Sequence, residues 1–102
     1  MESALTALAE PRRREILDVL GGSELSAGEI AGHFDVSRPA ISQHLGVLRA
    51  AGLVSERRAG TRRYYRARPE GVAELRTWLD TFWRDGLDRL RVEAEREAKQ
   101  RR

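Results

Sequence analysis

Two short helical patterns separated by a tight polar turn lie between Ser26 and Gly52, and this arrangement constrains the fold more than any other feature. Ser26 and Glu29 have the spacing of a capping box, in which each side chain satisfies a free backbone amide of the first helical turn. Ser37 is a candidate N-cap, and Pro39 falls in the first turn of the second helix, where its missing N–H removes no hydrogen bond. Gly52 is expected to end that helix. The segment therefore predicts a helix-turn-helix.

The second helix is predicted to have one buried face and one open face. Ile41, Leu45 and Leu48 recur at helical spacing and form the predicted buried stripe. The opposite face is small or polar throughout, with Arg38, Ser42, Gln43, Gly46 and Arg49. Another surface could therefore approach this open face closely.

That open face carries the residue types that read base edges in the major groove of DNA. Arg38 could pair with guanine and Gln43 with adenine, whereas Ser37 and Ser42 could serve either a base or a phosphate. His44 is expected to pack or to contact a phosphate, and its titration could tune the affinity for DNA near neutral pH. An ordinary solvated helix face is the alternative interpretation.

Two strands, Leu53–Arg58 and Thr61–Arg68, are predicted after the second helix, around a turn at Ala59-Gly60. Because Ala-Gly is a weaker turn signal than Asn-Gly, the pattern leaves the strand register open. Alternation along the second strand turns one of Tyr64 and Tyr65 into the core and leaves the other able to donate its hydroxyl group to a phosphate. The predicted hairpin thus directly follows the candidate recognition helix.

Positive charge is concentrated in the middle of the chain, although the net charge of the whole chain is only +3. Residues 37–68 hold eight arginines against one glutamate, a net charge of +7, whereas residues 1–36 carry −4 and residues 69–102 are balanced. Clustered cations of this kind indicate a partner with a phosphate backbone, and without a polyanion they would repel across the two strands. A solvated charged face is the alternative. The candidate DNA-binding residues are Ser37, Arg38, Ser42, Gln43, His44, Arg57, Arg58, Thr61, Arg62, Arg63 and Tyr64.

The region from Glu70 onward returns to a helical pattern, with an apolar band wider than one core-facing stripe. The band consists of Val72, Leu75, Trp78, Leu79, Phe82, Trp83, Leu87 and Leu90. Two short amphipathic helices are also predicted near residues 4–10 and 12–20, before the helix-turn-helix. A second copy of the chain is the expected cover for the band, because a chain of this size buries only a modest share of its surface alone.

At 102 residues the chain is expected to form one domain over residues 1–92, followed by a charged tail over residues 93–102 that is either helical or disordered. It has no cysteine, which excludes a disulfide framework, a thiolate metal site and a cysteine nucleophile. It has no signal-peptide pattern or membrane-length apolar run, so a soluble, cytoplasmic protein is expected. No pattern indicates a catalytic nucleophile, a carboxylate dyad or a phosphate-binding glycine loop, so neither an enzyme nor a cofactor is expected.

Motifs along residues 4–90 resemble the ArsR/SmtB-type bacterial repressors. The stretch ALAEPRRREILDVL is similar to the opening helices of that family, LSAGEIAGHFDVSRPAISQHLGVLRAAGLV to its helix-turn-helix, and RRAGTRRYYRA to its wing. The most specific matches are Ser37, Pro39, Ser42, His44, Leu45, Leu48, Gly52 and Leu53. The resemblance implies a mainly helical winged helix-turn-helix with a small β-hairpin, which is dimeric through its first and last helices. The implied interface residues are Leu5, Leu8, Leu75, Trp78, Leu79, Phe82 and Trp83.

The chain departs from this family at the residues that bind metals in many of its members. Ser26-Ala27-Gly28 stands where those relatives have cysteines, and the last helix has no histidine. Glu29 and His33 are one helical turn apart and could share an ion, but two ligands without a third do not make a typical site. The resemblance therefore implies the autorepressor branch of the family, with no metal effector.

These observations lead to two competing hypotheses of function. The first is a regulator, acting as a repressor, that binds double-stranded DNA at a pseudo-palindromic operator as a homodimer. The second is a winged-helix interaction module that binds a partner protein through the aromatic last helix, with Trp78 and Trp83 exposed. A self-dimer would bury Trp78 and Phe82, whereas a monomer would favour the second hypothesis.

Overall fold

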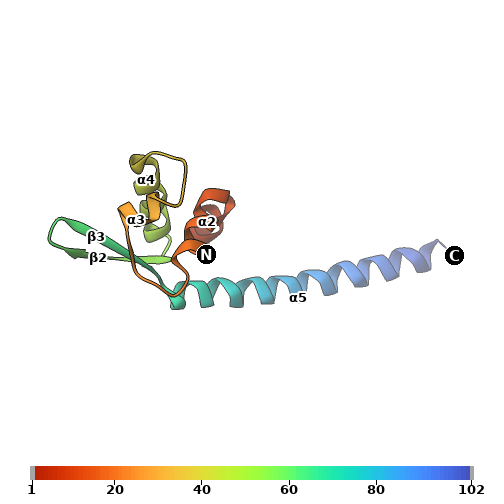
Figure 1. Ribbon diagram of the computed structural model, residues 1–102. Helices are drawn as coiled ribbons and strands as arrows, with labels where there is room; N and C mark the ends of the chain where they lie inside the picture. Colours follow the sequence, from red (N-terminus) through yellow and green to blue (C-terminus); the bar gives the residue numbers. More distant parts are fainter. Residues whose placement is uncertain (1, 102) are drawn as a thin grey trace.

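The computed structural model describes residues 2–101, which form five helices and a three-stranded sheet (Figure 1). In chain order the elements are α1 (Glu2–Ala9), α2 (Pro11–Leu20), β1 (Leu25–Ser26), α3 (Ala27–Ala31), α4 (Arg38–Ala50), β2 (Val54–Ala59), β3 (Arg62–Ala67) and α5 (Pro69–Gln100). The predicted fold class is confirmed, because helices dominate and the β2–β3 hairpin, called the wing below, directly follows α4. Figure 1 shows the helix-turn-helix and the wing at one end of α5, which projects away from them.

The core lies where α2, α3 and α4 meet the sheet, and the predicted stripe of α4 is part of it. Ile41, Leu45 and Leu48 are fully buried, as are Ile16 of α2 and Ile30 of α3. Full burial of a side chain of this size stabilises a fold by about 1.5–3 kcal/mol. The buried stripe fixes the rotation of α4 about its own axis, so the opposite face of α4 must point away from the core.

The two helices of the helix-turn-helix begin and end with the expected capping geometry. Ser26 Oγ accepts a hydrogen bond from the Glu29 N–H at 3.1 Å, and Glu29 Oε1 accepts one from the Ser26 N–H at 3.0 Å, so the predicted capping box is confirmed. Ser37 Oγ accepts a hydrogen bond from the Ala40 N–H at 3.3 Å. Gly52 has a φ of 77°, and its N–H and that of the following residue donate back into the last turn of α4. This Schellman arrangement satisfies the free carbonyl groups and ends α4.

The sheet has the strand order β1-β3-β2, so the wing carries a third strand that the sequence pattern did not predict. Strand β1 has only two residues, which is too short to show the alternation typical of a strand. The wing closes at the pair Ala59 and Arg62, so the predicted turn at Ala59-Gly60 is wrong by one residue. The turn residues are Gly60 and Thr61, and Gly60 has the positive φ, 63°, that a type II′ turn needs at its first position.

Helix α5 is anchored to the domain near its beginning. The Arg68 N–H donates a hydrogen bond to the Leu53 carbonyl oxygen at 2.8 Å. Gly71 lies directly against the backbone of Gly52, where a Cβ would overlap the carbonyl oxygen. From this anchor α5 continues to Gln100 and is about 48 Å long at 1.5 Å per residue. It therefore extends through most of the predicted charged tail, and residues 1 and 102 lie outside the described part of the chain.

The apolar band of α5 is largely open in the single chain. Trp78, Phe82 and Trp83 have 38 %, 55 % and 63 % of their surface exposed. Leu75, one of the predicted interface residues, is only 6 % exposed in the single chain, because it is one helical turn from the anchor at Gly71. None of the helices within residues 2–101 combines the length and the hydropathy that a membrane span requires.

Replacing Gly71 with alanine is expected to destabilise the fold by about 1–3 kcal/mol, because the added methyl group would push α5 away from the end of α4. Urea unfolding followed by circular dichroism, at one fixed protein concentration, measures the change. Gly46→Ala is the matched control, since a Cβ at Gly46 meets no atom of residues 2–101 within 4 Å and alanine is the better helix former. Equal stability of the two variants would contradict the close packing of Gly71 on Gly52.

Candidate nucleic-acid interface

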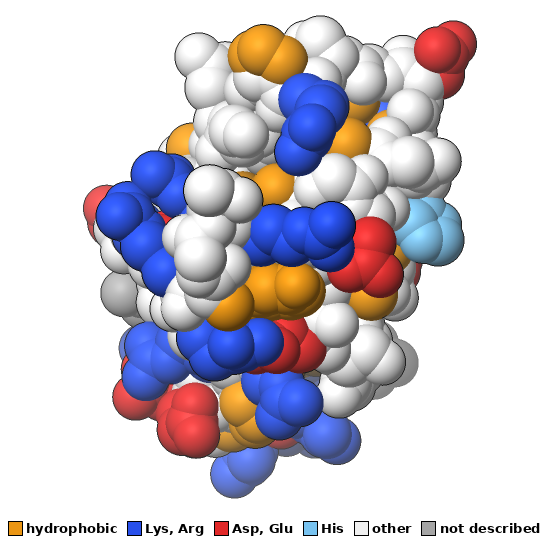
Figure 2. Space-filling model, turned by 60° about the vertical axis from the view of Figure 1, so that its left-hand side comes forward, with side chains coloured by type: hydrophobic (Ala, Val, Ile, Leu, Met, Phe, Trp, Pro, Cys, Tyr) orange, Lys and Arg blue, Asp and Glu red, His pale blue; other side chains and the backbone are white. Residues whose placement is uncertain are grey.

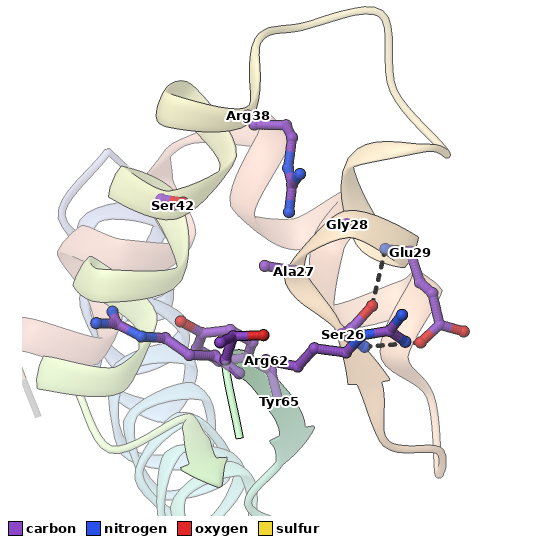
Figure 3. Close-up of a pocket in the computed structure, with 10 residues that line it drawn as sticks. Ser26, Ala27, Gly28, Glu29, Arg38, Ser42, Arg62 and Tyr65 are labelled. Atoms are coloured by element: carbon purple, nitrogen blue, oxygen red, sulfur yellow. Dashed lines mark hydrogen bonds between the residues drawn. The ribbon is translucent and has the colours of Figure 1, made fainter. Parts of the chain in front are cut away.

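A hollow of about 540 Å³ lies between the start of α3, the first turns of α4 and the tip of the wing (Figure 3). Five of the residues that were predicted to bind DNA line it, namely Arg38, Ser42, Thr61, Arg62 and Arg63. They come from α4 and the wing, which are separated in the sequence and share one core. The fold therefore gathers hydrogen-bond donors from a helix and a hairpin on one concave surface, called the hollow below.

Two arginines of the hollow, Arg38 and Arg62, form no ion pair within residues 2–101. Arg38 begins α4 and extends toward α3, where a Cβ on Gly28 would lie 3.3 Å from its Nη2. Figure 3 shows Arg38 pointing into the hollow from α4 and Arg62 pointing toward Glu29 from the wing. The planar guanidinium group of arginine can bind a phosphate or a guanine through two hydrogen bonds. Both side chains are therefore available to an anionic partner.

Glu29 is the acidic residue of the hollow, and its carboxylate is engaged in the capping box. Hydrogen bonds from Ser26 hold the pKa of Glu29 below its usual value of 4.5, and the positive charge of Arg62 acts in the same direction. The Glu29 carboxylate is thus turned to Ser26 and not shared with His33, which is exposed. Within residues 2–101 no three His, Cys, Asp or Glu side chains are grouped so that they could hold a metal ion.

The residues of α4 that were predicted to contact DNA do not all lie on the same face of the helix. Gln43 is exposed on the open face of α4, outside the hollow, and Gly46 follows on the same face. His44 is half-buried, and its Nδ1 lies 3.3 Å from Nη1 of Arg13 in α2. One residue corresponds to about 100° of rotation around a helix, which turns His44 away from the open face. Ser37 uses its hydroxyl oxygen to cap α4.

The outer face of the wing holds Arg57 beside a carboxylate and an aromatic ring. Arg57 donates hydrogen bonds to both carboxylate oxygens of Glu24, the shortest at 2.7 Å, and its guanidinium carbon lies 4.8 Å from the ring centre of Tyr64. The hydrogen bond from Arg57 is the main cause that lowers the pKa of Glu24, and the same bond raises the pKa of Arg57. Tyr65 is buried, so it is the inward residue of the predicted tyrosine pair.

The inner face of the wing places Glu56 among three arginines. Its carboxylate oxygens lie 3.0 Å from Arg49 of α4, 3.4 Å from Arg58 and 3.8 Å from Arg63, and its side chain is only 8 % exposed. Arg58 and Arg63 are directly opposite each other on β2 and β3. Like charges thus face each other across the wing, as expected, and Glu56 lies close enough to both to offset part of their repulsion. Figure 2 shows acidic side chains set among the Lys and Arg side chains at the wing end of the molecule.

Neither of the acidic residues that organise these arginines was predicted as part of the site. Glu56 is the one acidic residue in the segment 37–68, so the charge pattern could have singled it out. Glu24 precedes β1 and is 33 positions away from Arg57, so no local pattern connects the two residues. The contact of Arg13 with His44 spans 31 positions and was invisible for the same reason.

Comparison with known proteins gives the family of this chain. Residues 10–56, which include α2, α3 and α4, match the family described as "Bacterial regulatory protein, arsR family". The HTH-type transcriptional regulator Rv2034 of Mycobacterium tuberculosis is 51 % identical over 86 residues, which are 84 % of this chain and 80 % of that protein. The chain belongs to the arsR family of bacterial regulatory proteins. The transcriptional repressor SdpR of Bacillus subtilis is 37 % identical over 86 residues, which are 84 % of this chain and 96 % of SdpR.

Solved structures support the same family assignment. One is the crystal structure of a possible transcriptional regulator for arsenical resistance, which is 48 % identical to this arsR-family chain and has a TM-score of 0.76. The match covers 89 % of this chain and 95 % of that chain. Another is an ArsR-like transcriptional regulator from Rhodococcus sp. RHA1, which is 35 % identical and has a TM-score of 0.77. The match covers 99 % of this chain and 91 % of that chain. Members of the family are DNA-binding transcriptional regulators and not enzymes. The regulator hypothesis is thereby favoured over the interaction module.

In this arsR-family protein the pair of Glu24 and Arg57 is expected to make stability depend on pH. Because folding lowers the pKa of Glu24 from 4.5, the stabilisation by the pair is present above pH 4.5 and is lost as the pH falls through the lowered value. Glu24→Gln should therefore lower the midpoint of thermal unfolding at about pH 7, and its effect should shrink steadily as the pH falls below 4.5.

The matched control for this change is Glu74→Gln, which removes the same charge at an exposed position of α5 that has no ion pair within residues 2–101. That variant should differ little from the wild type across the same pH range. If the effect of Glu24→Gln were as large at acidic as at neutral pH, the pair would not be its cause.

Proposed function

We propose that this protein is a transcriptional repressor that binds a pseudo-palindromic operator in double-stranded DNA as a homodimer, with its own promoter as one candidate site. The observation that carries the proposal is the hollow, which Arg38 of α4 and Arg62 of the wing line together with Ser42 and Thr61, and in which neither arginine forms an ion pair within residues 2–101. Such a surface fits the phosphate backbone and the groove edges of one duplex. We propose further that the protein acts in the cytoplasm and that no metal ion acts as its effector. Its lack of cysteine supports the second point.

In the proposed complex, the open face of α4 enters the major groove. Arg38 lies in the first turn of α4, the part of a recognition helix that contacts base edges. Gln43 and Ser42 are exposed on the same helix and can reach bases, and Gly46 leaves room for close approach to the groove. Gln43 is the proposed reader of an adenine, because its amide can both donate to and accept from that base.

The wing supplies the proposed contacts to the phosphates beside the groove. Arg62, Arg63 and Thr61 lie at its tip, next to the start of α4. Arg57, Arg58 and Tyr64 follow along the two strands and are proposed to contact flanking phosphates or the neighbouring minor groove. Phosphate contacts of this kind position the protein on DNA but carry no sequence information.

The proposed homodimer forms through α1 and α5. Trp78 and Phe82 stack on each other with their ring centres 5.5 Å apart, and most of their neighbours on the same band are open in the single chain. Leu5 and Leu8 of α1 are only half-buried. An exposed apolar band such as that of α5 is typical of an interface between proteins. Two copies would place their α4 helices in successive major grooves about 34 Å apart.

The proposal is tested by the affinity of the wild-type chain for the intergenic DNA upstream of its own gene and for scrambled DNA of equal length at matched salt. The upstream DNA should bind about a thousandfold more tightly. Arg62→Ala should weaken binding to both duplexes and make the salt dependence shallower by about one unit of slope. Gln43→Ala should instead relax the preference at one operator position, at a cost of about 1–3 kcal/mol.

No preference of the wild type for the upstream DNA would overturn the proposed function. If Gln43→Ala, like Arg62→Ala, lowered the affinity for both duplexes by the same factor, Gln43 would not be a base reader. The proposed DNA-binding surface would still stand.

Phe82→Glu is expected to convert the homodimer into a monomer, because it places a charge in the apolar band of α5. Sedimentation velocity at micromolar protein concentration measures the mass of both forms. Arg84→Glu is the matched control, since it also introduces a glutamate but lies about 200° around the helix from Phe82. A wild-type chain that sediments as a monomer would contradict the proposed dimer.

A further inference from the structure

The position of Glu56 is unexpected for a surface that binds a polyanion. It is the one acidic residue among eight arginines in the segment 37–68. A carboxylate at this place repels the phosphate backbone and competes with it for the same guanidinium groups. On charge alone, Glu56 weakens binding to any DNA, so its presence needs another physical reason.

The contacts of Glu56 join the recognition helix to the wing. Arg49 belongs to α4, whereas Arg58 and Arg63 are opposite each other on β2 and β3, and all three lie within 4.0 Å of the Glu56 carboxylate. The side chain of Glu56 is 8 % exposed, while those of the three arginines are 54–69 % exposed. Glu56 is thus the fixed partner of three side chains that are otherwise free to move in solvent.

We propose that Glu56 is a positioning residue that holds Arg49, Arg58 and Arg63 in one arrangement and thereby raises discrimination between operator and other DNA. This inference rests on the proposed function. Long arginine side chains without a partner can adjust to the phosphates of any duplex, and such contacts carry no sequence information. When one carboxylate holds the three arginines, they can contact only DNA phosphates that lie in the right places while α4 is in the major groove. A duplex with a different sequence, in which α4 binds less well, therefore makes fewer of these phosphate contacts.

Charge alone and positioning predict different results for Glu56→Gln, which keeps the size of the side chain. Loss of the charge alone would tighten binding to every duplex by one common factor, whereas loss of positioning would lower the preference for the operator. The affinities of the full-length wild type and variant are measured on the duplex that the wild type prefers and on a scrambled duplex, over a range of salt concentrations. Release of the arginines should tighten binding to the scrambled duplex and steepen its salt dependence by up to about one unit of slope. The preference for the operator duplex should fall about tenfold, the size of the loss of one specific contact.

Asp18→Asn is the matched control, because it makes the same change in net charge on α2 at an exposed position with no ion pair within residues 2–101. It should change both affinities by the same factor. If Glu56→Gln also changed both affinities by one common factor, or changed neither, the positioning role would be overturned. A wild type without any preferred duplex would overturn the proposed function itself, which is a different result.

Glu56→Asp keeps the proposal testable if Glu56→Gln does not fold. It retains the negative charge but withdraws the carboxylate by one methylene group, so the contact with Arg49 at 3.0 Å is kept only if the Arg49 side chain leaves its present arrangement. We expect a reduced preference for the operator with an unchanged affinity for scrambled DNA. Wild-type affinity for both duplexes would show that only the charge of Glu56 matters, and would overturn the inference.

Discussion

The burial of Ile41, Leu45 and Leu48 is the interaction on which the rest of the structure depends. These residues fix the rotation of α4, and a shift by one residue would turn every exposed side chain of α4 by about 100°. Val54 and Tyr65 of the wing belong to the same core, so the wing is held against α4 by shared packing. The hollow is therefore built on rigid elements, which position functional groups more accurately than loops do.

The arginines of the basic segment fall into held and free groups. Glu24 holds Arg57, and Glu56 holds three more, whereas Arg38 and Arg62 form no ion pair within residues 2–101. Exposed ion pairs contribute little to stability, about 0–1 kcal/mol each. The value of these carboxylates thus lies in the geometry that they impose on their partners. In the proposed complex, the free arginines attract the phosphate backbone, and the held arginines fix the shape of the surface that meets it.

Sequence patterns predicted the parts of the fold that depend on local signals. The capping box at Ser26, the stripe of α4 and the basic segment are such features, because each is set by residues a few positions apart. Strand β1, the contact of His44 with Arg13 and the burial of Leu75 within its own chain were not predicted, since each depends on a contact with a distant element. Within the candidate site, the pattern named arginines and hydroxyl residues that line the hollow or the wing, but not the carboxylates that contact the wing arginines.

The contact of Gly71 with Gly52 connects the two halves of the proposed mechanism, because it joins α5, the proposed dimer helix, to the end of α4. In the proposed dimer, the angle between these helices would set the distance between the two recognition helices. Hydroxyl-radical footprinting of the bound operator measures that distance most directly. The proposed dimer predicts two symmetric protected stretches on one face of the duplex, about 34 Å apart. A single protected stretch, or none, would contradict it.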